Sequence, residues 1–264
     1  MEHAKRSDLP VKEGNGTHGS HWEAVRPGSE WVETLVGDVV RTGKTVAKRW
    51  RGHNIETGRE QDNLTNCHVK AMGSLRAFVL TVNGSLWSAY PVPATKAVYP
   101  LQGLHHVISW ENQIEGQWAV KVLGASLTAF DPFFFRTQGQ PPRTNLMKFS
   151  GFAYAVRKSQ DPHLVVAGER RSARGAAFIL PSQQGFPDDL MFQMPVQKME
   201  EVDMMGSPGY RFTGPIFLGE GGSKPFIIPV YVAAHAIHGE VPGPGDDMEG
   251  TLWLQGSFVK KQEG

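Results

Sequence analysis

The sequence predicts a mainly β fold with little helix, built as two tandem small β-barrel or sandwich halves of OB-like architecture. From Trp31 onward the apolar residues recur with a period close to two, as they do in strands with one buried face. The 264 residues include 30 glycines and 18 prolines, which favours many turns over long helices. Large antiparallel sheets close into barrels or pack as sandwiches, because both arrangements protect the strand edges.

The first thirty residues differ from the rest of the chain. Residues 1–30 are polar, with scattered Gly and Pro, and contain no apolar run long enough for a signal peptide or a membrane span. We expect this segment to form a flexible N-terminal arm. Because no other segment resembles a membrane span, we expect no membrane partner.

The first half of the chain, residues 31–135, is expected to form one β-barrel-like domain. The dipeptide Asn83-Gly84 separates two apolar runs, which is the strongest short-range hairpin signal. Gly37 lies where a barrel of the OB type bends its first strand around a corner. The expected strands are Trp31–Arg41, Cys67–Met72, Leu75–Val82, Ser85–Tyr90, Leu104–Asn112 and Gln117–Phe130.

A polar stretch rich in Gly and Pro, residues 136–146, is expected to link this half to a second β-rich domain at 147–260. The segment Leu190–Met205 has a helical pattern, but Pro195 interrupts it, so the expected helix is Val196–Met205. The two halves share a weak repeat, a Gly-bounded strand that contains a Trp. The expected strands of the second half are Met147–Lys158, His163–Ala167, Ala176–Leu180, Tyr210–Leu218, Phe226–His235 and Thr251–Lys260.

Composition and motifs argue against several classes of function. The single cysteine, Cys67, excludes an internal disulfide framework and any multi-cysteine zinc site, and it is typical of a protein of the reducing cytoplasm. Gly43-Lys44-Thr45 lacks the upstream glycine of a phosphate-binding loop, and the chain has no nucleophile elbow or dinucleotide fingerprint. We therefore expect no cofactor and favour a non-catalytic protein over an enzyme.

The most charged stretch is Arg41–Arg59, where six basic residues stand against Glu56 alone. Basic side chains attract phosphates by releasing counterions, and an interleaved Trp can stack on an unpaired base. The alternative is a solubilising β-loop, which the near-neutral total charge supports. The candidate nucleic-acid contacts are Arg41, Lys44, Lys48, Arg49, Trp50 and Arg51.

Trp253 is the candidate partner-binding residue. Its strand phase places it opposite Leu252 and Leu254, which are expected to face the core. A Trp on the polar face of a strand either meets a second layer or contacts a partner. We expect an interface, with packing between the two halves as the alternative.

The cluster most like a metal site is His235 and His238 with Glu240 nearby. On a strand, residues three apart lie on opposite faces, so both rings converge only if the chain bends at His238-Gly239. Surface histidines are the simpler interpretation, and no metal ligand is assigned.

The function predicted from these features is a non-catalytic binding or assembly module of a cytoplasmic protein complex, with the basic segment as a contact for nucleic acid. Its expected partner is another protein or a second copy of the chain, which would make it an oligomer. The main alternative is an OB-like single-stranded nucleic-acid-binding protein. The third is a metal-dependent enzyme using His235 and His238.

Overall fold

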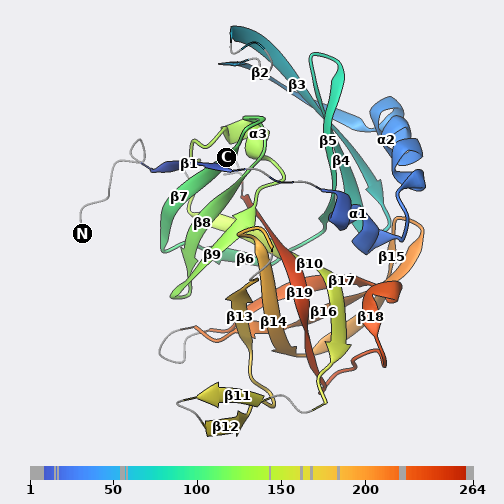
Figure 1. Cartoon of the computed structure of the whole chain (residues 1–264), viewed down its shortest axis with the longest axis vertical. Helices are drawn as coiled ribbons and strands as arrows, with labels where there is room; N and C mark the ends of the chain where they lie inside the picture. Colours follow the sequence, from blue (N-terminus) through green and yellow to red (C-terminus); the bar gives the residue numbers. More distant parts are fainter. Residues whose placement is uncertain are drawn as a thin grey trace, which may run out of the picture.

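A main sheet of thirteen strands, a small sheet of four strands and one separate hairpin form most of the described chain (Figure 1). The structure, a computed structural model, describes residues 9–14, 16, 18–53, 57, 59–142, 144–160, 163–166, 169–182, 185–219 and 224–259. Three α-helices lie within these residues: α1 (Gly19–Val25), α2 (Glu30–Thr42) and α3 (Phe134–Thr137). The predicted mainly β character is confirmed. None of the helices in this part of the chain is long and apolar enough to cross a membrane.

The small sheet is an antiparallel meander at the top of the view in Figure 1. Its strands in order are β2 (Lys44–His53), β3 (Glu60–Met72), β4 (Leu75–Val82) and β5 (Ser85–Pro93). The predicted hairpin turn joins β4 to β5, and Asn83 and Gly84 both have positive φ, 50° and 88°, as a tight hairpin turn requires. The predicted bounds of β4 are confirmed.

The main sheet runs in the order β1-β7-β8-β9-β19-β10-β17-β16-β15, with β6, β13, β14 and β18 joined to it beside this path. In its first part lie β1 (Val11–Gly14), β6 (Val98–Pro100), β7 (Gly103–Trp110), β8 (Gly116–Val122) and β9 (Ala125–Phe130). The others are β10 (Leu146–Lys158), β13 (Phe178–Pro181), β14 (Asp189–Pro195), β15 (Lys198–Met204), β16 (Ser207–Phe217), β17 (Phe226–Ala233), β18 (Ile237–His238) and β19 (Asp247–Phe258). A hairpin of β11 (His163–Val166) and β12 (Glu169–Ser172) stands apart, and a single 3-10 turn, η3 (Ala234–Ala236), follows β17.

The strand order is open in both large sheets. No strand pairing between described residues joins β1 to β15 or β2 to β5, so neither sheet closes into a barrel. The main sheet also combines strands from both sides of residues 136–146: β9 precedes this stretch, and β10 and β19 follow it.

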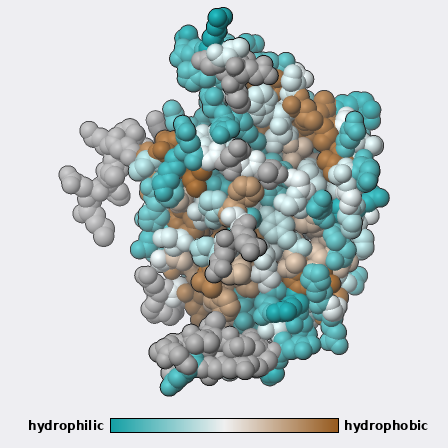
Figure 2. Space-filling view, viewed as in Figure 1, coloured by the Kyte–Doolittle hydropathy of each residue, from teal (hydrophilic) through white to brown (hydrophobic). Residues whose placement is uncertain are grey.

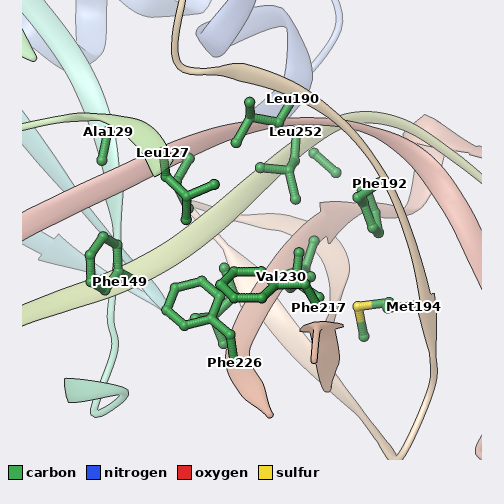
Figure 3. Packing of buried hydrophobic residues seen from close by; sticks show 14 of the residues in the cluster. Leu127, Ala129, Phe149, Leu190, Phe192, Met194, Phe217, Phe226, Val230 and Leu252 are labelled. Atoms are coloured by element: carbon green, nitrogen blue, oxygen red, sulfur yellow. The ribbon is translucent and has the colours of Figure 1, made fainter. Parts of the chain in front are cut away.

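Strand β19 lies in the middle of the main sheet and is buried on both faces. It pairs with β10 along one edge and with β14 and β9 along the other. Leu252 and Leu254 point into one hydrophobic cluster, the inner core, which also holds Phe149 and Val230 (Figure 3). Trp253 points the opposite way, into a second cluster. The alternation of strand side chains thus supplies two cores from one strand.

The second cluster, here called the junction core, lies where the main sheet, the small sheet and α1 meet. Its large side chains that are less than 2% exposed include Phe78, Tyr90, Phe130, Phe152 and Trp253. They come from both sheets, so the junction core joins the small sheet to the main sheet.

Helix α1 corrects the expectation of a flexible arm over residues 1–30. Trp22 is 5% exposed, and its indole N–H donates to the Ala89 carbonyl of β5 at 2.9 Å. Val25 on the same helix is fully buried, and β1 pairs in parallel with β7. The arm was inferred from low hydrophobicity, but a few large apolar side chains suffice to fix a short helix in a core. Residues 1–8 lie outside the described part of the chain.

Helix α2 corrects the expected strand Trp31–Arg41. Its apolar residues fall in neighbouring pairs four residues apart, and Leu35 and Val39, which have this i, i+4 spacing of a helix, are both buried. Acidic Glu30 and Glu33 in the first turn favour a helix through its dipole. Tertiary packing on β3 and β4 decides the matter.

Two further expectations in the chain are wrong. The expected helix Val196–Met205 is an edge strand, β15, because it pairs along its whole length with β16. The expected strand Gln117–Phe130 is a hairpin, β8 and β9, whose turn contains Leu123 and Gly124 with positive φ.

Replacing Trp22 by Ala tests whether α1 is part of the core. Because Trp22 is buried and hydrogen-bonded, Trp22→Ala is expected to lower the free energy of unfolding by about 3–5 kcal/mol, as in other large-to-small core substitutions. Urea denaturation followed by circular dichroism measures this change. Ser20→Ala, at an exposed position of the same helix, is the control and should leave stability nearly unchanged. Equal stability of the two variants would contradict the docking of α1.

Candidate functional site

The predicted basic segment forms β2, the outermost strand of the small sheet. In the described chain β2 pairs with β3 alone, and most of its side chains are exposed. We call β2 together with Arg41, at the end of α2, the basic edge; its charged side chains are those of Arg41, Lys44, Lys48, Arg49 and Arg51. An edge strand leaves alternate backbone N–H and C=O groups unpaired, so this surface offers both hydrogen bonds and positive charge. In Figure 2 the top of the molecule, where β2 and β3 lie in Figure 1, is mainly hydrophilic where it is not grey.

The structure divides the predicted nucleic-acid contacts between the two faces of β2. Val46 and Trp50 pack against the junction core, so Lys48, in the same phase, lies on the inner face. Arg49 and Arg51, in the opposite phase, lie on the outer face. Cations on both faces give the strand positive charge whichever face a partner approaches.

Trp50 is placed for packing more than for stacking on a base. Its indole N–H donates to the Thr65 hydroxyl of β3 at 2.9 Å, and the side chain is only partly exposed. A methyl group at Gly52 would come within 2.0 Å of the indole ring, so the ring lies directly over that glycine. The expectation that Trp50 stacks on a base therefore gains no support from its contacts.

Ion pairs leave part of the basic edge unneutralised. Arg51 pairs with Glu60 at 3.2 Å, and Arg41 pairs with Asp38 at 3.2 Å. Asp38 also accepts a hydrogen bond from Lys70, which holds the pKa of its carboxyl below the usual value. Lys44, Lys48 and Arg49 form no ion pair with the described residues, and all three are exposed. Their charges are available to an anionic partner.

The far end of β2 is tied to the main sheet. The side chain of Gln113, in the turn between β7 and β8, accepts from the His53 backbone N–H at 3.4 Å and donates to the His53 carbonyl at 3.3 Å. The Gln113 amide thus bonds both the N–H and the C=O of His53, as a residue of a neighbouring strand would. These two hydrogen bonds fix this end of the basic edge. A fixed strand binds with a smaller entropy cost than a mobile loop.

Trp253, the predicted partner-binding residue, is 1% exposed and contacts no outer surface. Its ring stacks on His21 of α1 with centroids 3.6 Å apart and planes 6° from parallel, and its N–H donates to Asp188 at 2.8 Å. The prediction that Trp253 contacts a partner is therefore wrong. The strand phase was correct, but the side of β19 that carries Trp253 is covered by a second layer.

A buried polar cluster, which was not predicted from the sequence, lies beside Trp253. His18 Nδ1 lies 2.8 Å from His21 Nδ1, and His18 Nε2 lies 2.6 Å from Glu115. Glu115 also accepts from Ser88 of β5 at 2.8 Å and from Asn112 at 2.6 Å. One carboxylate thus connects α1, the small sheet and the turn between β7 and β8. The spacing of His18 and His21, three residues apart, could have indicated that both lie on one side of a helix. This signal was not used because the segment was expected to be a flexible arm.

Histidine protonation in this cluster is restricted by geometry. Only one proton fits between the two Nδ1 atoms, so His18 and His21 cannot both be doubly protonated in this arrangement. Burial lowers the pKa of His21 well below its ordinary value, and the nearby His18 lowers it further. His21 is therefore neutral in the folded protein.

A small pocket opens beside the same cluster. Its volume is 410 Å³, and its lining includes Ser20, Glu23, Tyr154 and Asp189. A β-bulge in β10 leaves Tyr154 outside the strand register, and its hydroxyl donates to Asp189 at 2.6 Å. Burial raises the pKa of the Tyr154 hydroxyl. The raised pKa keeps the Tyr154 hydroxyl protonated at neutral pH, so it can donate its hydrogen bond to Asp189.

Asp188 is the most perturbed carboxyl beside the pocket. It is 2% exposed, and burial raises its pKa to about 7. Gln117 and Trp253 each donate a hydrogen bond to it, at 2.7 and 2.8 Å. Both carboxylate oxygens accept hydrogen bonds from the protein itself. Asp188, which directly precedes β14, thereby links this strand to β8 and β19.

His235 and His238, the residues proposed for a metal-dependent enzyme, have different surroundings. His235 donates to the Glu23 carbonyl of α1 at 3.0 Å, and His238 is exposed on β18. Glu240 lies 3.9 Å from Lys158, which reduces its value as a ligand. In the part of the chain that the structure describes, no group of three or more His, Cys, Asp or Glu could hold a metal ion.

Comparison of the chain with protein-family models, curated proteins and solved structures finds no match.

Replacing Asp188 by Asn tests the buried carboxyl through the pH dependence of stability. The folded pKa of about 7 lies above the ordinary value of 3.8, so the folded state holds the proton more tightly. This contribution is complete below about pH 4 and is lost as the pH rises to about 7. Between about pH 5 and pH 7 the wild type should lose about 2 kcal/mol more stability than Asp188→Asn, in which Gln117 can flip its amide to keep the hydrogen bond.

Urea denaturation at the two pH values measures this difference. Asp62→Asn, at an exposed position of β3, is the control and should follow the wild type. A wild-type slope that is unchanged in Asp188→Asn would contradict the assignment.

Proposed function

We propose that this protein is a non-catalytic binding module of a protein assembly, and that the basic edge is its contact surface. The observation that carries this proposal is an exposed outer strand, β2, with unneutralised cations and with its far end held by Gln113. Partners add a strand to such an edge through main-chain hydrogen bonds, and alternate side chains supply specificity. The cations select an acidic, extended partner segment.

The buried polar cluster supports a non-catalytic function. Its carboxylates and histidines bond to one another and to neighbouring elements, and none of the bonds involves an exposed nucleophile. Arrays of this type fix helices and strands in register. We assign the cluster to the stability of the junction core.

Single-stranded nucleic acid is the second candidate, because Lys44, Lys48 and Arg49 would neutralise phosphates as readily as carboxylates. An OB-like barrel in each half would favour this candidate, since such barrels bind single strands. The open strand order and the hydrogen-bonded Trp50 favour a protein partner instead.

We further propose a cytoplasmic location. Cys67 is a free, fully buried thiol of β3, and burial raises its pKa to about 12. A lone unpaired cysteine is common where the environment is reducing.

Reversal of three charges on β2 tests the proposal. We expect wild-type protein to bind a fluorescent peptide of alternating Glu and Val, measured by polarisation, and Lys48→Glu/Arg49→Glu/Arg51→Glu to lose at least about tenfold in affinity, because attraction becomes repulsion. The matched control, Lys12→Glu/Arg76→Glu/Arg174→Glu, makes the same change of net charge at exposed positions away from β2 and should bind as the wild type does.

Three outcomes would overturn the proposal. The first is wild-type protein that does not bind the acidic peptide, and the second is an equal loss in both triple variants. The third is tighter, steeply salt-dependent binding of a single-stranded oligonucleotide that only the β2 variant loses, which would establish the nucleic-acid candidate.

A further inference from the structure

One edge strand of the main sheet carries the opposite charge to β2. Strand β15 ends the main sheet, pairs with β16 alone along its length, and carries Glu200, Glu201 and Asp203. Glu201 and Asp203 are exposed. Strand β2 is thus a basic outer strand and β15 an acidic one.

Part of the acidic strand is already covered. Gly73, in the turn between β3 and β4, bridges to Met204, and the Ser74 N–H donates to the Asp203 carbonyl at 2.7 Å. These contacts occupy the last residues of the outer edge of β15. The segment Lys198–Val202 keeps an outer edge without a strand neighbour among the described residues.

We propose that the basic edge of one copy adds to the β15 edge of a second copy, so that the chain assembles head to tail. This inference rests on the proposed function and names its partner. Two β2 strands would repel each other, and so would two β15 strands, while β2 and β15 attract. Among the three pairings that these two strands alone could form, opposite charges favour β2 with β15.

One register of the two strands matches their charges best. A parallel alignment with Arg49 opposite Glu201 also sets Lys48 opposite Glu200 and brings Arg51 to the end of β15 beside Asp203. The faces agree as well, because Trp50 then lies opposite Val202, and both side chains pack against the junction core in their own copies. The antiparallel registers bring fewer of these charges together.

The pair Arg49 and Glu201 is the most informative for a test. Neither side chain forms an ion pair with the described residues, and both are exposed, so replacing them should not disturb the fold. Glu200 is less suitable, because it is held by Arg211 at 2.7 Å and Lys198 at 3.1 Å within its own chain.

The geometry of this contact predicts open-ended assembly. The two surfaces lie on different strands of the same chain, so the contact is heterologous, and each copy keeps one free edge after pairing. Such contacts form rings when the rotation closes and filaments when it does not. The average mass in solution should therefore rise with concentration beyond that of a dimer.

Sedimentation velocity of the full chain over a range of concentrations tests the proposal. We expect the wild type to associate more weakly as salt is added, and Arg49→Glu and Glu201→Arg each to weaken association at least about tenfold. The double variant Arg49→Glu/Glu201→Arg should regain association, and an equal mixture of the two single variants should associate too. Arg76→Glu, an exposed charge reversal on β4 inside the same sheet, is the matched control and should behave as the wild type does.

The outcomes separate this inference from the proposed function. A wild type that stays monomeric at submillimolar concentration, yet binds the acidic peptide through β2, would overturn self-assembly and leave the binding function in place. Single variants that weaken association without recovery in the double variant would overturn the pairing of Arg49 with Glu201. A monomer that also fails to bind the peptide would overturn both.

Discussion

Burial of β19 on both faces is the constraint on which the rest of the structure depends. Leu252 and Leu254 require an inner core on one side, and Trp253 requires a cover on the other. The main sheet provides the first by packing its own strands around that core. The small sheet and α1 provide the second, which places the N-terminal segment against a strand more than 200 residues later in the chain.

The junction core is unusual for the polar groups it contains. Glu115, Asp188 and His21 are each 2% exposed, and burying such groups without partners would cost several kcal/mol. Glu115 and Asp188 each have a hydrogen-bond partner from another element, His18 and Trp253. His21 bonds to His18 at the start of its own helix and stacks on Trp253 of β19. Hydrogen bonds of this type specify one arrangement of α1 and the two sheets, whereas apolar contacts alone would tolerate several. The stability of the small sheet, and so the position of β2, follows from this arrangement.

A sheet with exposed outer strands must avoid unspecific pairing, and charge is the common means. Here two of the outer strands carry opposite signs: Lys48 and Arg49 lie on β2, and Glu200 and Glu201 lie on β15. The same side chains that prevent like edges from pairing make the unlike edges complementary. Protection from aggregation and the capacity for directed assembly therefore have one physical origin in this fold.

The sequence by itself determined the features that depend on neighbouring residues. The period of two gave the mainly β class, Asn83-Gly84 set the hairpin of β4 and β5, and the concentration of cations after Arg41 marked the basic edge. Tertiary structure decided the rest. Whether Lys198–Met204 is a helix or a strand depends on the surface it packs against, because its pattern is ambiguous locally. The segment Glu30–Thr42 carries a local helical signal in the spacing of Leu35 and Val39, and packing on β3 and β4 fixes the position of this helix. Trp253 has the predicted strand phase. The face of β19 that carries it is covered by His21, which belongs to a segment that was expected to be flexible. Contacts between residues so distant in the chain leave no local pattern, since each partner's sequence is compatible with several environments.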